Sequence, residues 1–225
     1  MIDSNLHHTP LFSALDDEAA TALKQSMVPQ TIKKGQTLFQ EGEPGDRLYV
    51  VTEGKIKLSH ASGDGRESVL MVLGPGDMFG ELSLFDPGPR TATASAVTDA
   101  EVLGLGHTDL NPWLAGRPEV SKALLQALAH RLRRTNETMS DLVFADVPGR
   151  VAKALLELGE KFGTKTNDGL YVHHDLTQEE LAQLVGASRE TVNKALADFA
   201  SRGWVKLETR SVEILDVERL SKRAR

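Results

Sequence analysis

The sequence contains no cysteine. This absence excludes disulfides, zinc sites with thiolate ligands, cysteine-ligated iron–sulfur clusters and catalysis by a thiol. A run of 18 apolar residues is also lacking, so no membrane-spanning helix is expected. The first eight residues have neither the basic start nor the apolar stretch of a signal peptide. We therefore expect a cytoplasmic protein.

What is present is a chain of 225 residues, of which 40% are hydrophobic and 26% charged. That length and balance predict a folded protein of one large domain or two small ones. The net charge of −6 is unevenly distributed. Residues 1–149 carry 13 Lys and Arg against 20 Asp and Glu, whereas residues 150–225 carry 13 against 12. This asymmetry is expected if only the C-terminal part meets phosphate.

Short apolar runs recur about every ten residues between residues 30 and 110, and glycines separate them. Runs such as 48–51 and 102–105, with turn residues between them, predict a β-sandwich or β-roll. Residues 62–65, Ser-Gly-Asp-Gly, predict a hairpin turn because glycine accepts the positive φ that such turns need. Apolar residues at helical spacing predict a helical segment over residues 9–28.

A long helix is predicted over residues 119–144, after Pro118. Its apolar seam follows spacings of three and four, through Leu125, Leu128, Leu132, Thr135, Met139 and Leu142. Such a heptad seam usually packs against a partner helix. The alternative is a helix that lies on its own domain's sheet. Thr135 is polar inside the seam and weakens the packing unless it is hydrogen-bonded.

Asp146-Val147-Pro148-Gly149 ends the long helix and forms the predicted domain boundary and hinge. Asp146 is a plausible N-cap for the next helix, whose first turn tolerates Pro148. An amphipathic helix over 151–162, a polar loop over 163–169 and a short strand over 170–172 are expected to follow.

Two short helices joined by a tight turn are predicted next. Thr177 with Glu180 three residues later forms a capping box that starts the first helix, and Ser188 caps the second. Gly186 between them is free to take a left-handed conformation. A hairpin over residues 204–215 completes the layout of a winged helix–turn–helix.

The second of these helices presents Arg189, Glu190, Asn193 and Lys194 on its polar face. Arginine can pair with both acceptors of guanine, and glutamate can accept from the cytosine amino group. The face therefore suits the major groove of DNA. The alternative is an ordinary solvated face on a structural helical hairpin, against which the caps, the glycine turn and the wing argue.

A further segment that carries chemistry runs over residues 75–91. Gly80 opens a one-turn helix whose free N–H groups favour an anion. Arg90 supplies a positive fork that suits phosphate, and Thr91 supplies a hydroxyl. Glu81 is an acceptor suited to a ribose hydroxyl. The segment thus offers groups for a phosphate and a sugar. The alternative is a Glu81–Arg90 salt bridge that closes a β-turn.

These motifs resemble those of one family over nearly the full length of the chain. Residues 79–85 with Arg90-Thr91 resemble the phosphate-binding cassette of the cyclic AMP receptor protein / fumarate-nitrate reductase regulator (CRP/FNR) family of transcription factors. Residues 147–152 resemble its hinge, and residues 176–182 with residues 185–192 resemble its DNA-reading motif. The chain looks most similar to the actinobacterial branch, which includes the GlxR-type global regulators.

The resemblance implies an α+β fold in three parts. These are an N-terminal β-roll (jelly-roll) cyclic-nucleotide-binding domain over residues 1–116, a long dimerisation helix over 117–145, and a C-terminal winged helix–turn–helix DNA-binding domain over 146–225. It further implies a homodimeric activator or repressor, with cyclic AMP as allosteric effector, that binds a palindromic TGTGA-type site in double-stranded DNA. RNA polymerase is an expected partner; no metal, membrane contact or enzymatic activity is expected.

The resemblance also implies individual roles at the ligand. Ribose and phosphate would be held by Gly80, Glu81, Leu82 and Ser83, and the cyclic phosphate would be clamped by Arg90 and Thr91. Thr135 and Asn136 match the positions at which the family contacts the base, so the purine would hydrogen-bond Thr135 inside the seam. Asn136 departs from the serine of the best-known relative.

At the DNA, the residues implied by the motif are Thr177, Gln178, Ser188, Arg189, Glu190, Thr191, Asn193 and Lys194. Arg189 and Glu190 are expected to read G·C pairs. Lys194 stands where the best-known relative has an arginine and is expected to make a weaker contact, because lysine cannot bind in a bidentate manner.

Three alternatives remain open. A regulator of the same family could sense another effector, such as 2-oxoglutarate, or none. A cyclic-nucleotide module could regulate an enzyme by protein contact, although the polar face at Arg189 and Glu190 argues against it. A hydrolase of cyclic nucleotides would need a metal-ligand cluster, and the histidines, among them the pairs His7-His8 and His173-His174, are scattered and are interpreted as surface residues.

Overall fold

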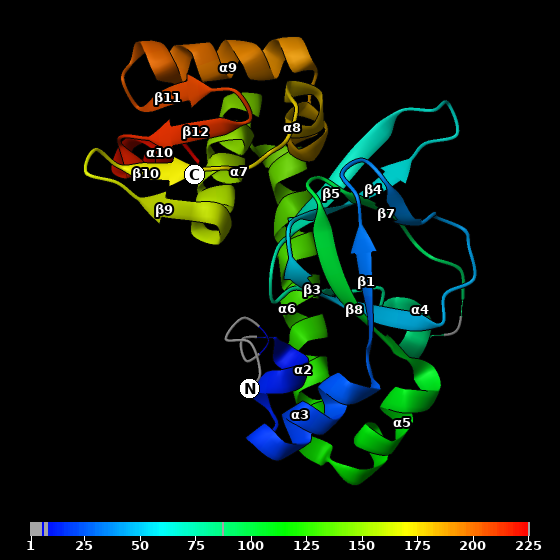
Figure 1. Ribbon diagram of the computed structural model, residues 1–225. Helices are drawn as coiled ribbons and strands as arrows, with labels where there is room; N and C mark the ends of the chain where they lie inside the picture. The colour runs from blue at the N-terminus through cyan, green and yellow to red at the C-terminus, as the bar shows by residue number, and fades with distance from the viewer. Residues whose placement is uncertain (1–5, 7–8, 87, 225) are drawn as a thin grey trace. The chain divides into compact units, whose positions relative to one another are not determined.

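The computed structural model describes Leu6, residues 9–86 and residues 88–224 (Figure 1). The chain divides into two compact units. One consists of residues 1–60 and 70–134, and the other of residues 61–69 and 135–225. The first unit is rich in strands, and the second combines helices with a small sheet. The expected α+β fold is therefore confirmed.

Two four-stranded sheets form the β-roll, in the orders β1-β8-β3-β6 and β2-β7-β4-β5. The strand bounds are β1 Val28–Ile32, β2 Thr37–Phe39, β3 Arg47–Glu53, β4 Ile56–Ala61, β5 Glu67–Leu73, β6 Met78–Phe79, β7 Thr93–Ala96 and β8 Ala100–Gly106. The longest pairing joins β3 and β8, with Tyr49 opposite Gly104. The predicted hairpin turn at residues 62–65 connects β4 to β5, and Gly65 N–H donates to the Ser62 carbonyl. The apolar runs thus form strands as the sequence predicts.

The core between the two sheets is aromatic. Phe39, Tyr49 and Phe79 have ring centroids 5.4–6.0 Å apart, and Phe79 is fully buried. Val51 and Val102 fill the same core from neighbouring strands. The spacing suits aromatic pairs, which contribute beyond the area that they bury. This aromatic cluster stands directly beside the strand that leads into residues 80–91.

A second core lies where helices of the first unit pack against β3 and β8. It is formed by α2 (Pro10–Ser13), α3 (Asp17–Ser26), α5 (His107–Gly116) and the first turns of α6 (Pro118–Phe144). Phe12, Leu23 and Leu110 are fully buried there against Leu48 and Leu105. The helical segment predicted near the N-terminus is confirmed as α2 and α3.

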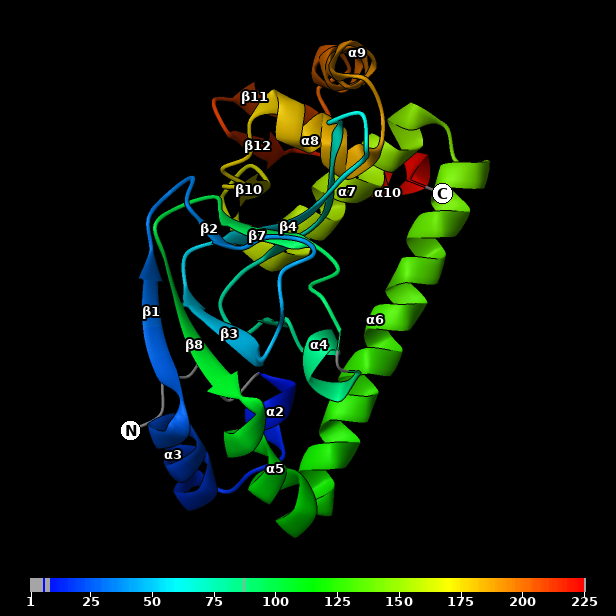
Figure 2. The same cartoon turned by 90° about the vertical axis from the view of Figure 1, so that its right-hand side faces the viewer.

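Helix α6 extends over 27 residues and agrees with the predicted long helix (Figure 2). In its first turns Val120 and Leu124 are buried. Residues of the predicted seam are not buried in this way: the side chains of Leu125, Leu132 and Met139 are between 62% and 66% exposed. The seam therefore does not lie on the sheet of its own domain, which was the alternative.

The second unit holds the remaining helices and a sheet of order β11-β12-β10-β9. The bounds are α7 Val147–Phe162, β9 Gly163–Lys165, β10 Leu170–Val172, α8 Gln178–Val185, α9 Arg189–Ser201, β11 Val205–Glu208, β12 Ser211–Ile214 and α10 Val217–Arg223. Helices α8 and α9 with the hairpin β11–β12 make the predicted winged helix–turn–helix.

The expectation of a polar loop over residues 163–169 is wrong for its first part. Gly163, Thr164 and Lys165 form strand β9, which pairs with β10 in the register Gly163↔Val172. An edge strand is held by backbone hydrogen bonds, so it needs no apolar alternation. Glycine is needed at the first residue of β9, Gly163, because a Cβ there would lie 2.2 Å from the Gly159 carbonyl oxygen.

Candidate nucleotide-binding and DNA-binding sites

Gly80 shapes the start of the predicted phosphate-binding segment. It follows β6 with a φ of +77°, a conformation that side chains disfavour. A Cβ at this position would also lie 2.8 Å from Nη1 of Arg90. Helix α4 (Leu82–Phe85) follows at once and is a single turn. Glycine is therefore required both by the backbone and by the close approach of Arg90.

Arg90 is 4% exposed and points into the roll. Its Nη1 donates to the carbonyl oxygens of Arg47 at 2.8 Å and Gly80 at 2.9 Å. Its guanidinium lies 4.2 Å from the ring centroid of Phe39 and 5.7 Å from that of Tyr49. Burial lowers the pKa of the guanidinium, but arginine stays charged in proteins. A fixed, buried positive charge is thus present where the sequence predicts one.

Glu81 is 1% exposed and forms an ion pair with Arg131 of α6. The alternative, a salt bridge between Glu81 and Arg90, is wrong. Among the described residues, only Arg131 forms an ion pair with the carboxylate of Glu81. The second oxygen of Glu81, Oε2, is buried without a hydrogen-bond partner, as is Nε of Arg90. A buried carboxylate oxygen and a buried guanidinium donor both lack partners, and burying such groups unpaired is costly.

Ser83 and Gly45 complete this small region. Ser83 is 8% exposed. A Cβ built on Gly45 would lie 2.5 Å from Oγ of Ser83 and 2.9 Å from Nε of Arg90, so the three residues converge. Leu82 and Thr91 are exposed. The residues present fit a ligand that has hydroxyl donors for Glu81 and an anionic group for Arg90, which is the chemistry of a cyclic nucleotide.

Sequence reasoning missed Arg131 as a member of the site. It lies on α6 four residues before Thr135, so the i, i+4 relationship of a helix was the available signal. Thr135 and Asn136 are exposed on α6 and belong to the second compact unit. Their contact with a purine base therefore stays a prediction.

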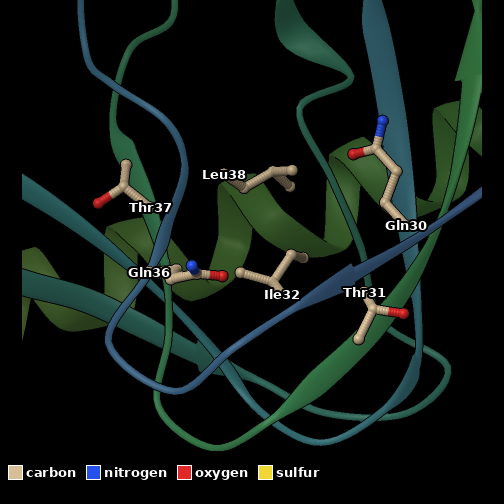
Figure 3. Close-up of a pocket in the computed structure, with 6 residues that line it drawn as sticks. All are labelled: Gln30, Thr31, Ile32, Gln36, Thr37 and Leu38. Atoms are coloured by element: carbon tan, nitrogen blue, oxygen red, sulfur yellow. The ribbon is translucent and has the colours of Figure 1, made fainter.

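An open pocket elsewhere on the first unit has a different character (Figure 3). It is lined by residues of β1 and β2 and of the turn between them: Gln30, Thr31, Ile32, Gln36, Thr37 and Leu38. None of these side chains is ionisable, and none belongs to the predicted ligand site. The pocket offers no positively charged side chain to hold a phosphate.

The predicted caps of the helix–turn–helix are confirmed. Thr177 and Glu180 make a reciprocal capping box at the start of α8. Gly186 ends that helix with a φ of +69°, and Ser188 caps α9 by accepting from the N–H of Thr191. Each cap satisfies backbone groups that a helix end otherwise leaves open. These local signals fix where the second helix begins.

The polar face of α9 carries the predicted DNA-reading side chains. Arg189, Glu190 and Lys194 are exposed, while Asn193 is half-buried. Nζ of Lys194 lies 2.7 Å from Oε1 of Glu190. Oε1 of Gln178, on α8, accepts from both Asn193 and Arg189. Ser188 and Thr191 are also exposed, with 2.8 Å between their hydroxyl oxygens.

The predicted hinge residues are held by side chains of the second unit. Asp146 caps α7 by accepting from Gly149 N–H, and it forms an ion pair with Arg223 of α10. The hydrogen bond from Arg223 is the main cause that lowers the pKa of Asp146. Arg150 donates to the carbonyl oxygens of Ala145, Val185 and Gly186, at 2.8, 3.0 and 3.2 Å. It thereby links the end of α6 to the turn of the helix–turn–helix.

The interpretation of the histidines as surface residues is wrong for His174. His174 is 6% exposed, and its Nδ1 accepts from the N–H of Leu176, which orders the approach to α8. His173 is exposed, while His7 and His8 lie outside the described residues. Across the described parts of the chain, no three His, Asp or Glu side chains gather as a metal site would need. The helices of the same parts are all too short or too polar to cross a membrane.

Two family models match the chain. The cyclic nucleotide-binding domain matches residues 29–116, and the Crp-like helix-turn-helix domain matches residues 149–223. The chain is 54% identical over 224 residues to the "CRP-like cAMP-activated global transcriptional regulator" of Mycobacterium tuberculosis, and the match covers 100% of both chains. It is 36% identical over 206 residues to the "Cyclic AMP receptor protein" of Thermus thermophilus, with 92% of each chain covered.

Among solved structures, the crystal structure of the Thermus thermophilus catabolite activator protein is similar with a TM-score of 0.56 and 35% identity. The match covers 96% of this chain and 98% of that one. A sequence identity of 35% over almost the whole length of both chains indicates a common family and not only a common fold. Taken with the buried Glu81–Arg90 region and the helix–turn–helix of α8 and α9, these similarities establish that the chain belongs to the CRP/FNR family of transcription regulators.

Proposed function

We propose that this chain is a cyclic-AMP-responsive, dimeric regulator of transcription that acts in the cytoplasm and has no enzymatic activity of its own. The observation that carries the proposal is the pair of buried polar atoms without partners, Oε2 of Glu81 and Nε of Arg90. A ribose hydroxyl would satisfy the first, and a cyclic phosphate the second. The names of the two relatives, both of which refer to cyclic AMP, support the same ligand.

Gly80, Glu81, Leu82 and Ser83 would hold ribose and phosphate, and Arg90 with Thr91 would clamp the phosphate. Thr135 and Asn136 would take the purine. Because Thr135 lies in the seam of α6, the ligand would favour one arrangement of two paired helices and shift the population toward it. The seam supports such a two-fold pair, because Leu125, Leu132, Met139 and Leu142 are exposed and Leu128 is half-buried.

Rotation at the hinge, Asp146–Gly149, would then place two α9 helices one DNA turn apart, roughly 34 Å, on a palindromic TGTGA-type site. Arg189 and Glu190 would read G·C pairs, with a weaker contact from Lys194. Thr177, Gln178, Ser188, Thr191 and Asn193 would complete the DNA interface. RNA polymerase would be the partner through which the bound dimer activates or represses.

The test is operator affinity at a fixed, stated salt concentration, measured with and without cyclic AMP. Salt has to be fixed because phosphate contacts make affinity fall steeply as salt rises. We expect tighter binding with cyclic AMP, and calorimetric titration with cyclic AMP and cyclic GMP then gives ligand choice and stoichiometry. Equal affinities with and without ligand would refute the allosteric proposal.

A further inference from the structure

A polar bridge connects the two helices of the helix–turn–helix. Gln178 is the first residue of α8, and its Oε1 accepts from Nδ2 of Asn193 at 3.2 Å. The same oxygen accepts from Nη2 of Arg189 at the longer distance of 3.4 Å. We call Gln178, Asn193 and Arg189 the glutamine bridge. It joins residues that are 11 and 15 positions apart in the sequence.

The orientation of both amides in the bridge follows from Arg189. A guanidinium carries only donors, so Gln178 has to turn its oxygen, and not its NH₂ group, toward Arg189. Asn193 must then present its own NH₂ group, because its oxygen would meet the oxygen of Gln178. The result leaves Oδ1 of Asn193 buried without a partner. The chain thus tolerates one unsatisfied oxygen in the arrangement that holds Arg189.

The bridge acts on one of the two side chains expected to read bases. Glu190 is paired with Lys194, one turn along α9, whereas the hydrogen bonds to Gln178 in the described part of the chain come from Arg189 and Asn193. Arg189 is exposed, so without the bridge its long side chain would sample many rotamers. Donation of one N–H to Gln178 leaves the remaining donors of the guanidinium for a guanine.

We propose that Gln178 and Asn193 are positioning residues that order Arg189 before DNA binding and so set how strongly the protein discriminates a guanine. This inference rests on the proposed function. It assigns Gln178 a role different from a phosphate contact, which would carry no sequence information.

The experiment is a double-mutant cycle with Gln178→Ala and Arg189→Ala in the full chain. The probes are a duplex with two inverted TGTGA half-sites and duplexes in which each G·C pair of the half-sites is exchanged in turn, at one salt concentration and with saturating cyclic AMP. We expect Gln178→Ala to weaken binding to the TGTGA duplex about 3- to 10-fold, the range for one or two lost hydrogen bonds. The preference at one exchanged pair should fall by the same factor.

In the Arg189→Ala background the same substitution should change the affinity by less than about 2-fold, since its effect passes through Arg189. Asn193→Ala should cause a smaller loss of the same preference. Gln178→Glu keeps an acceptor for Arg189, so we expect lower affinity for every duplex but an unchanged preference. Ser201→Ala, at the exposed end of α9, is the matched control and should change neither quantity.

The proposal is overturned if Gln178→Ala weakens all duplexes equally, or equally in both backgrounds, because either result indicates a direct phosphate contact. It is also overturned if Gln178→Ala and Asn193→Ala leave the preference unchanged. A wild-type chain that binds none of the duplexes would instead count against the proposed function. Thermal melting of each variant checks the fold, and Gln178→Glu and Asn193→Ala decide the matter if Gln178→Ala melts early.

Discussion

Glu81 and Arg131 form an ion pair in which the carboxylate is almost fully buried and the guanidinium is partly exposed. The two residues are 50 positions apart, so the pair ties the proposed ligand-binding segment to the long helix α6 within the first unit. One oxygen of Glu81 is used in the pair, and the other stays available for a ligand.

Arg131→Gln should destabilise the ligand-free protein by about 3 kcal/mol, because it leaves the buried carboxylate of Glu81 without its counter-charge. Urea denaturation of the full chain measures the free energy of unfolding. The double variant Arg131→Gln with Glu81→Gln should recover part of the loss. Arg66→Gln, which breaks an exposed pair with Asp64, should cost much less than Arg131→Gln. Equal costs for the two arginines would contradict the prediction.

Arg90→Ala should abolish the binding of cyclic AMP and leave the roll folded. The substitution removes the only buried guanidinium among the described residues that lies beside Gly80 and Ser83. Arg90→Lys should restore little, since lysine cannot keep both backbone bonds, the contact with Phe39 and a bidentate phosphate contact. Calorimetric titration measures binding, and circular dichroism checks the fold. Normal titration by either variant would show that the phosphate site is elsewhere.

Asp146→Asn should lower stability at neutral pH and have little effect in acid. Arg223 and the N–H of Gly149 hold the pKa of Asp146 below its usual value, so the charged form stabilises the folded state. This stability is present above the unfolded-state pKa and is lost as pH falls through the lower, folded-state pKa. Asparagine is an equally good N-cap, so the variant isolates the charge.

Because the pair is exposed, we expect a difference of no more than about 1 kcal/mol at pH 7. The difference should disappear below the folded-state pKa of Asp146. Urea denaturation at several pH values gives both quantities. A difference that persists unchanged in acid would assign the effect to the cap and not to the charge. Arg223→Gln should reproduce the pH profile of Asp146→Asn.

Leu132→Glu should convert a dimer into monomers. Leu132 is 62% exposed in the middle of the α6 seam, and a carboxylate there would have to be buried between two helices. Sedimentation equilibrium measures the mass of the wild-type chain and the variant. Val217→Glu, at an apolar position of α10 that is 46% exposed and off the seam, is the control and should stay dimeric. A dimeric Leu132→Glu variant would place the interface elsewhere.

Local signals in the sequence predicted the local parts of the structure. The capping box of Thr177 and Glu180, the left-handed Gly186 and the cap at Ser188 depend only on neighbours within a few residues. The β-roll also followed from short apolar runs and turn residues. For the same reason the start of α9, and with it the exposed placement of Arg189, could be predicted residue by residue.

Long-range contacts could not be predicted in this way. The partner of Glu81 is Arg131, 50 residues away, and nothing in the sequence near Glu81 indicates it. The burial of His174 depends on the turn that leads into α8. Strand β9 is polar and exists because β10 offers it backbone hydrogen bonds. In each case the fold decides which of several chemically acceptable partners a group receives.

The hydrogen bonds of Arg150 affect how readily the chain can bend at the predicted hinge. Its single guanidinium holds the carbonyls of Ala145, Val185 and Gly186, on either side of the predicted hinge and in the DNA-reading motif. A swing of α7 against the end of α6 must first release the charge-assisted hydrogen bond from Arg150 to Ala145, while the bonds to Val185 and Gly186 can stay intact. Arg150 therefore holds the present angle between the end of α6 and α7, and a chain that lacks this hydrogen bond would swing at the predicted hinge more readily.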